Sequence, residues 1–122
     1  MPGTLIITEG TLISERHAGR PNVPGIWSDA QISAWKEIVD AVHAKGCRIW
    51  CQLWSLGRGG TPEVLESVGS HLMSSSAVPL KGEGKQTPVE MSEEDIQMTI
   101  QEYVRAARNA LAAGFDGVEL HG

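Results

Sequence analysis

The sequence is poor in cysteine, in aromatic residues and in long apolar runs, and it carries no excess of positive charge. Two cysteines in 122 residues do not make a disulfide framework. Lysine and arginine number 10 against 15 aspartates and glutamates, so the net charge is −5 and neither a nucleic acid nor an anionic membrane is expected as a partner. Every apolar run is far shorter than the roughly 18 residues that a membrane span needs.

The composition is that of a folded chain. Hydrophobic residues make up 41% of the sequence and charged residues 20%, which is typical of a globular protein rather than a disordered one. The length allows one domain at most. The first residues contain no basic region followed by an apolar one, so no secretory signal is expected and a cytoplasmic location is predicted.

Apolar runs and helix-capping residues alternate along the chain. Residues 4–8 are rich in β-branched side chains, a pattern typical of a strand that is buried on both faces. Ser28 with Gln31, and Ser92 with Asp95, have the spacing of capping boxes at the start of helices. The expected elements are a strand at 4–8, a helix from 28 to about 45, a strand at 48–54, a helix from 92 to about 113 and a strand at 116–121.

This order predicts a parallel α/β fold, because each strand leads into a helix before the next strand begins. Alternation along residues 48–54 places three apolar side chains on one face and the larger or polar ones on the other; these sets are Ile49, Cys51 and Leu53, and Trp50, Gln52 and Trp54. Residues 55–91 are rich in glycine, serine and proline, and they are expected to form a long loop with a helical turn near 62–66. A loop of this length is a candidate lid or wall of a site.

Polar and aromatic side chains mark the ends of the predicted strands, where ligands bind in parallel α/β folds. The residues at these ends are Glu9 and Gly10, Gln52 and Trp54, and Glu119 and His121. An amide, an indole and an imidazole at neighbouring strand ends suit a planar heterocycle with a donor and acceptor edge, such as a flavin or a base. The alternative is that the glutamine and the histidine are structural residues with their own hydrogen-bond partners.

Other candidate sites are weaker. His43, Cys47 and Cys51 have a spacing that suggests metal ligands, but Gly46 separates them, so no metal site is expected. Residues 57–60 are glycine-rich and follow a strand, yet they lack the spacing of a phosphate-binding loop and favour a flexible loop.

The sequence offers no serine nucleophile of the usual hydrolase kind, and two histidines lie in predicted loops. The chain contains no Gly-x-Ser-x-Gly motif. His17 and His71 lie in predicted loops and are expected to be solvated.

Five segments of the chain form a recognisable series: residues 5–11 (LIITEGT), 21–28 (PNVPGIWS), 52–58 (QLWSLGR), 106–110 (AARNA) and 113–122 (AGFDGVELHG). In this order they resemble the Old Yellow Enzyme family of flavin-dependent ene-reductases. The resemblance covers essentially the whole chain. Residues 51–54 (CQLW) and 74–79 (SSSAVP) are most similar to the fungal members.

The resemblance implies a (β/α)₈ barrel that holds FMN at its carboxyl-terminal mouth and is reduced by NAD(P)H. The activity that it implies is hydride transfer to the alkene of a small α,β-unsaturated carbonyl compound. By the same resemblance Gly10 and Gln52 contact the flavin, His121 lies near the flavin and holds the substrate carbonyl as a catalytic residue, and Trp54 lines the substrate pocket.

Residues 1–122 match only part of such a barrel, about strands two to four of eight with the two intervening helices. The strand before residue 4, a second carbonyl donor, a tyrosine proton donor and the phosphate-binding strands have no counterpart here. The chain is therefore expected to be an incomplete barrel segment that is itself inactive. Two alternatives stay open: a stand-alone α/β module without catalysis, and another barrel enzyme, such as a glycosidase that uses Glu9 and Glu119.

Overall fold

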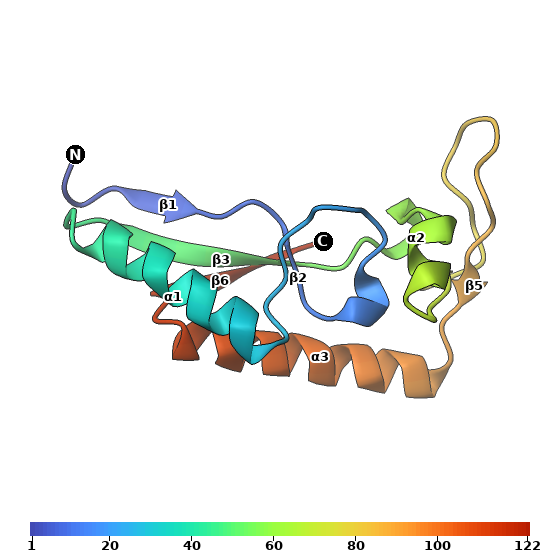
Figure 1. Ribbon diagram of the computed structural model, residues 1–122. Helices are drawn as coiled ribbons and strands as arrows, with labels where there is room; N and C mark the ends of the chain where they lie inside the picture. Colours follow the sequence, from blue (N-terminus) through green and yellow to red (C-terminus); the bar gives the residue numbers. More distant parts are fainter.

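A computed structural model describes all 122 residues and has a parallel sheet centred on β3 (Arg48–Trp54) (Figure 1). β1 (Leu5–Ile7) and β2 (Thr11–Leu12) pair in parallel with one edge of β3, and β6 (Gly117–His121) pairs in parallel with the other. The prediction of a parallel α/β fold is therefore confirmed. The sheet is open and no barrel is closed.

The strand predicted at 4–8 is shorter than expected and is followed by a bulge. Ile7 pairs with Trp50 and Thr11 pairs with Leu53. Residues 8–10 therefore lie opposite only two residues of β3, 51 and 52. The backbone N–H of Gln52 donates to the Thr8 hydroxyl at 3.0 Å within this bulge. Bulges of this kind redirect a chain next to functional sites, and this one contains Gly10.

Helix α1 (Asp29–His43) connects β2 to β3. It begins after Ser28, whose hydroxyl accepts from the Gln31 backbone while the Gln31 side chain accepts from the Ser28 backbone, as the capping-box spacing predicted. The helix ends two residues before the predicted Lys45, and Gly46 follows with a φ of +71°, which glycine adopts without strain.

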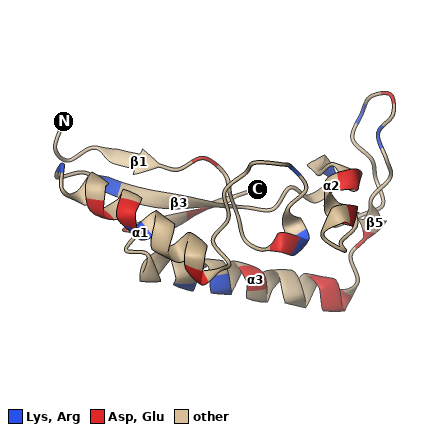
Figure 2. Ribbon diagram, viewed as in Figure 1, with Lys and Arg blue, Asp and Glu red and all other residues tan.

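Helix α3 (Glu93–Ala112) connects β5 to β6 and lies beside α1. Ser92 and Asp95 form the predicted capping box, and acidic residues gather at the start of the helix, where the helix dipole favours negative charge (Figure 2). Gly114, at a φ of +95°, follows the helix end. No helix in the chain combines the length and the apolar composition that crossing a membrane requires.

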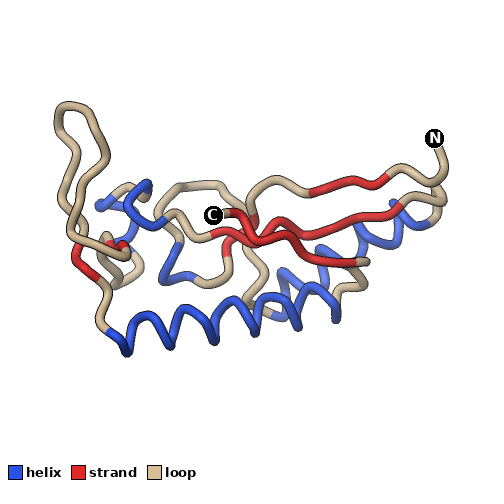
Figure 3. Tube along the Cα trace, turned by 180° about the vertical axis from the view of Figure 1, so that it is seen from behind, coloured by secondary structure: helices blue, strands red, loops and turns tan.

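Both long helices cover the same face of the sheet, as the two opposite views agree (Figures 1 and 3). Ile49, Cys51 and Leu53 point to this face and are buried, which confirms the predicted alternation of β3. Trp35 of α1 packs on Phe115 with ring centroids 5.4 Å apart. The rest of the buried cluster consists of Ile13, Ile26, Val39, Ala106, Ala110 and Ala113.

The other face of the sheet is open. Leu5, Ile7 and Trp50 share this face by register, and their exposed fractions are 49%, 47% and 38%. The expectation that the first strand is buried on both faces is therefore wrong for this chain. β1 lies at the edge of the sheet, has β3 as its single neighbour, and has no element packed over this face.

The carboxyl-terminal end of the sheet carries the short elements of the chain. The helical turn predicted near 62–66 is α2 (Pro62–Ser67). Residues predicted as a flexible glycine-rich loop include the short 3₁₀ helix η2 (Gly57–Gly59), and β4 (Met73–Ser74) pairs in parallel with β5 (Val89–Glu90). These elements lie beside η1 (Glu15–His17), a 3₁₀ helix in a segment for which no helix was predicted (Figure 1).

Candidate functional site

The predicted site residues come together at the end of the sheet where the carboxyl-terminal ends of its parallel strands lie. Because β3 and β6 are parallel and in register, Gln52 lies beside Glu119 and Trp54 lies beside His121. All four belong to the open face, because Leu53, which lies between Gln52 and Trp54, is buried against the helices and β6 is in register with β3. The convergence that alternation predicted for an amide, an indole and an imidazole is thus present.

The Trp54 indole has three neighbours, His121, Arg20 and Gly10. The ring of His121 meets it edge-on, with ring centroids 5.9 Å apart, and the guanidinium of Arg20 lies 5.9 Å from the indole centroid. Gly10 lies against the same indole, so closely that a Cβ added there would be 2.6 Å from Trp54 Cε3. A larger residue at position 10 would displace the indole, which gives a reason for glycine independent of any ligand.

Gln52 retains hydrogen-bonding groups for a ligand. Its Nε2 donates to Glu119 Oε2 at 2.8 Å, and the amide still has a second N–H and its carbonyl oxygen. One free donor beside one free acceptor matches the alternating acceptor and donor groups on the pyrimidine edge of a flavin. The residues present therefore fit FMN on the chemistry of the donor set.

His121 differs from Gln52 in having no hydrogen-bond partner among the side chains. It is exposed, and either ring nitrogen can donate to an oxygen of a ligand placed beside Trp54. The structure brings four of the predicted site residues to one end of the sheet: Gly10, Gln52, Trp54 and His121. The roles that the resemblance implies for them stay predictions.

Arg20 was not predicted. It lines a polar groove of about 290 Å³ that also contains Arg58, Lys85 and the acidic Glu63. Because Arg20 also lies over Trp54, this groove adjoins the candidate site. Its position depends on a loop whose course the local sequence does not reveal.

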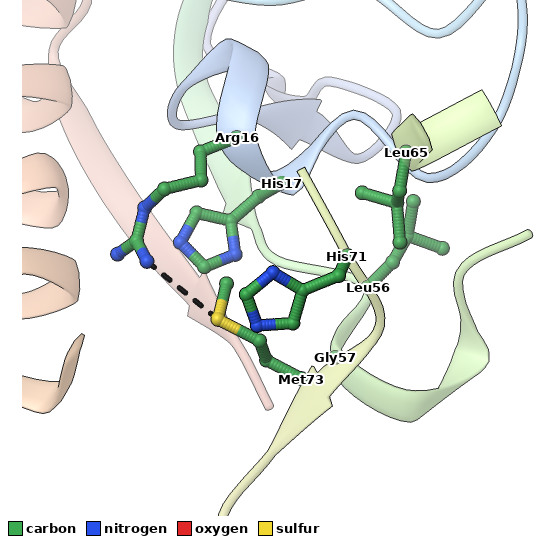
Figure 4. Close-up of a pocket in the computed structure, with 7 residues that line it drawn as sticks. All are labelled: Arg16, His17, Leu56, Gly57, Leu65, His71 and Met73. Atoms are coloured by element: carbon green, nitrogen blue, oxygen red, sulfur yellow. Dashed lines mark hydrogen bonds between the residues drawn. The ribbon is translucent and has the colours of Figure 1, made fainter. Parts of the chain in front are cut away.

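His17 is buried, so the expectation that it is solvated is wrong. Its Nε2 lies 3.0 Å from Glu102 Oε2 and its Nδ1 lies 2.8 Å from the Ser55 hydroxyl. Its ring faces a cavity of about 10 Å³, about the space of one water molecule, next to Met73 and His71 (Figure 4). His71 is exposed, as expected.

The weak metal-site candidate does not assemble. His43 Nε2 bonds to Asp116 Oδ2 at 2.8 Å, and Cys51 is buried in the core, where burial raises the pKa of its thiol to about 11. No group of three or more histidine, cysteine, aspartate or glutamate side chains is arranged to hold a metal ion.

Comparison with known proteins agrees with the resemblance noted in the sequence. A model of the NADH:flavin oxidoreductase / NADH oxidase family matches residues 1–122. The chain is 58% identical over 123 residues to a probable inactive reductase, easA, of Epichloe festucae var. lolii, and 58% identical over 122 residues to an NADP-dependent oxidoreductase, lnbE, of Aspergillus flavus. Each alignment covers 100% of this chain and 32% of the relative.

A solved structure has the same fold over this length. The Old Yellow Enzyme of Pichia sp. AKU4542 superposes with a TM-score of 0.89 at 40% identity, covering 97% of this chain and 33% of that one. The chain thus spans about a third of the length of the proteins that it matches, and its strands and helices are part of a (β/α)₈ barrel. Because the family model covers every residue, the chain belongs to the NADH:flavin oxidoreductase / NADH oxidase family.

Proposed function

We propose that residues 1–122 are part of an FMN-dependent oxidoreductase that transfers hydride from NAD(P)H to the alkene of an α,β-unsaturated carbonyl compound. The observation that carries the proposal is the convergence of Gly10, Gln52 and His121 around Trp54 at one edge of the sheet. Membership of a flavin oxidoreductase family supports it, because an amide and an imidazole there suit a flavin and a carbonyl substrate.

Within this proposal Gln52 and Gly10 orient the cofactor. When bound, FMN supplies the two-electron chemistry that carries hydride from the nicotinamide to the substrate. The free N–H and carbonyl of Gln52 hold the pyrimidine edge, and its bond to Glu119 keeps the amide from rotating. The backbone at Gly10 would meet the flavin, and the absence of a side chain there leaves room for the Trp54 indole.

His121 and Trp54 serve the substrate. As hydride reaches the alkene, negative charge develops on the carbonyl oxygen, and an N–H of His121 stabilises it by donating a hydrogen bond. Trp54 forms an apolar wall beside that histidine. One member of the family at 58% identity is named as NADP-dependent, which supports NADPH as the reductant.

The proposal extends to the architecture and the location of the protein. Residues 1–122 form about strands two to four of the barrel, and the remaining strands supply further contacts to the flavin and the substrate. The substrate is a small molecule. A cytoplasmic location is supported by the absence of a disulfide framework in the sequence.

The test uses the full-length protein that contains this segment. Purified protein is expected to be yellow from bound flavin and to oxidise NADPH in the presence of cyclohexenone under anaerobic conditions. His121→Ala should lower kcat by about 10²-fold or more, because one donor to the developing oxyanion is lost. His71→Ala is the matched control, since that histidine is exposed and far from Trp54 along the chain. A folded protein without flavin and without alkene reduction would contradict the proposal.

A second candidate is a member of the family that keeps the fold without catalysis. It is favoured by the identity of 58% to a relative named as a probable inactive reductase. The same assay separates the two: a protein that folds and binds flavin but does not reduce enones, and in which His121→Ala changes nothing, is the outcome that the second candidate predicts.

A further inference from the structure

A buried polar cluster connects α3 to the end of β3, and none of its members belongs to the proposed catalytic set. Its centre is His17, which is 7% exposed and lies between Glu102, 5% exposed, and Ser55. Arg16 completes the cluster, with its Nη2 donating to Glu102 Oε2 at 3.0 Å and its Nη1 donating to Asp95 Oδ1 at 3.2 Å. Figure 4 shows Arg16 and His17 side by side on η1.

The hydrogen bonds of His17 have a defined direction. A carboxylate only accepts, so the His17 Nε2 that lies 3.0 Å from Glu102 carries the hydrogen. Burial is the largest cause lowering the pKa of His17, and Arg16 also lowers it, so the ring is neutral near pH 7 and its Nδ1 has a free lone pair. Nδ1 therefore accepts from the Ser55 hydroxyl at 2.8 Å.

Ser55 directly follows Trp54, the residue that Gly10 and His121 contact. Its hydroxyl is held by His17 Nδ1 at 2.8 Å. The chain is thus held through a side chain just after the last residue of β3. The carboxylate on the other side of His17 belongs to α3, so the chain just after β3 is linked to this helix.

We propose that His17 is a positioning residue that fixes the Trp54 indole in the active site by linking the Ser55 hydroxyl to the Glu102 carboxylate of α3. This inference rests on the proposed function, since Trp54 matters here as a wall of the substrate pocket. The side-chain hydrogen bonds of His17 go to Glu102, Ser55 and Thr99, and none goes to Gln52 or His121. Its effect on the reaction is transmitted through one hydroxyl and one peptide unit.

The experiment removes the hydroxyl and leaves the buried charges intact. In the flavin-loaded full-length enzyme, Ser55→Ala should lower kcat/KM for an enone about tenfold by loosening Trp54, because small displacements of positioning groups have large effects on rate. The near-ultraviolet circular dichroism of the indole should change with it. Ser55→Thr, which keeps the hydroxyl, should restore both values, and Ser67→Ala, on the exposed side of α2, is the matched serine control.

The outcomes separate the two proposals. If the unsubstituted enzyme lacks flavin and activity, the proposed function fails. If it is active and Ser55→Ala lowers only the melting temperature, with kcat, KM and the indole signal unchanged, the cluster merely stabilises the fold and the inference is overturned. If Ser55→Ala does not fold, two other variants test the inference. It requires that Ser55→Thr have a kcat/KM near that of the wild type and that His17→Gln have a lower one.

Discussion

At the scale of single residues, the Trp54 indole restricts the size of the side chains that can lie next to it. The indole lies against the backbone of Gly10 on one side and meets the ring of His121 at its edge. Arg20 adds a cation 5.9 Å from the ring centroid. A change at any of these positions therefore acts first on the indole, and through it on the shape of the open face next to Gln52.

Gly10→Ala tests this contact. The new Cβ would lie 2.6 Å from Trp54 Cε3, so the indole must move, and overpacking of this kind costs about 1–3 kcal/mol of unfolding free energy. Urea unfolding of the full-length protein should show the loss, and tryptophan fluorescence should change. Gly59→Ala is the control, because a Cβ there meets nothing within 4 Å. Equal stability and fluorescence for Gly10→Ala and wild type would contradict the steric account.

The buried His17 predicts a stability change between neutral and mildly acidic pH. Its pKa lies below the ordinary value of 6.5, chiefly because of burial, so the unfolded chain binds the proton more readily than the folded one. Stability is then complete above about pH 6.5 and falls as the pH drops below it. Arg16 opposes protonation as well, whereas Glu102 favours it.

Urea midpoints at pH 7.5 and pH 5.5 measure this effect. The drop between the two should be smaller in His17→Gln than in wild type, and His71→Gln, which changes an exposed histidine, should keep the full drop. Glu102 contributes at a lower pH than His17: burial acts to raise the pKa of this carboxyl, but Arg16 and His17 lower it overall, so the stability that depends on the carboxylate is lost only at more acidic pH. An identical pH dependence in His17→Gln and wild type would rule out His17 as the source.

The two cysteines should differ in reactivity. Cys51 is fully buried with its thiol pKa raised to about 11, while Cys47 is half-buried at the start of the sheet. Thiolates are the reactive form, so iodoacetamide at pH 8 should modify Cys47 much faster. Tryptic cleavage at Arg48 separates the two residues, and mass spectrometry of the two peptides reads the rates. Faster modification of Cys51 would contradict the burial described here.

At the scale of elements, Asp116 joins three of them at the amino-terminal end of the sheet. Its Oδ2 accepts from the Ile49 backbone at 2.9 Å and from His43 at 2.8 Å, and its Oδ1 accepts from Arg48 at 2.7 Å. These bonds connect α1, β3 and the residue that leads into β6. They lower the pKa of the Asp116 carboxyl strongly, with the Ile49 N–H as the largest cause.

Asp116→Asn should therefore lower the melting temperature at pH 7, because the amide cannot replace the charge that His43 and Arg48 face. Asp40→Asn is the comparison, since its exposed pair with Lys36 is of a kind worth about 0.3–0.5 kcal/mol. The carboxyl is stabilising above its ordinary pKa, so the difference between Asp116→Asn and wild type should shrink as the pH falls below about 3.8. A loss no larger than that of Asp40→Asn would show that the three bonds contribute little.

The elements themselves could largely be predicted from the sequence, because their signals are local. Ser28 with Gln31, and Ser92 with Asp95, lie three residues apart and form the capping boxes that their spacing predicted. Alternation along β3 likewise separated the core face from the site face. The contact between His17 and Glu102 could not be predicted in this way, because the two residues are 85 positions apart and nothing near His17 marks it as buried.

The part of the candidate site that depends on local sequence pattern could also be predicted. Gln52, Trp54 and His121 follow from strand ends and alternation, whereas Arg20 and Glu102 depend on how loops and helices pack. The bulge after Ile7 also went unpredicted, since it depends on the register between β1 and β3. Local sequence pattern thus predicts the site residues at the strand ends. The residues that contact them from loops and helices depend on tertiary packing and could not be predicted.

At the scale of the whole molecule, the helices cover one face of the sheet and leave the other open. Leu5, Ile7 and Trp50 expose 38–49% of their surface on that face. β1 and β6 are both edge strands. Exposed apolar sheet faces and unpaired edges drive association, so the chain carries surfaces suited to further packing.

The 122-residue chain expressed alone should therefore self-associate, and the full-length protein should not. Sedimentation velocity at increasing concentration should show oligomers or aggregates for the isolated chain, together with strong binding of an apolar dye and a broad thermal transition. Trp50→Lys, which places a charge in the middle of the open face, should reduce the association, and Trp35→Lys is not a usable control because that ring packs on Phe115. Ile38→Lys, on the exposed surface of α1, is the better comparison. If the isolated chain instead stays monomeric and melts in one sharp transition, the open face does not drive association and this prediction is wrong.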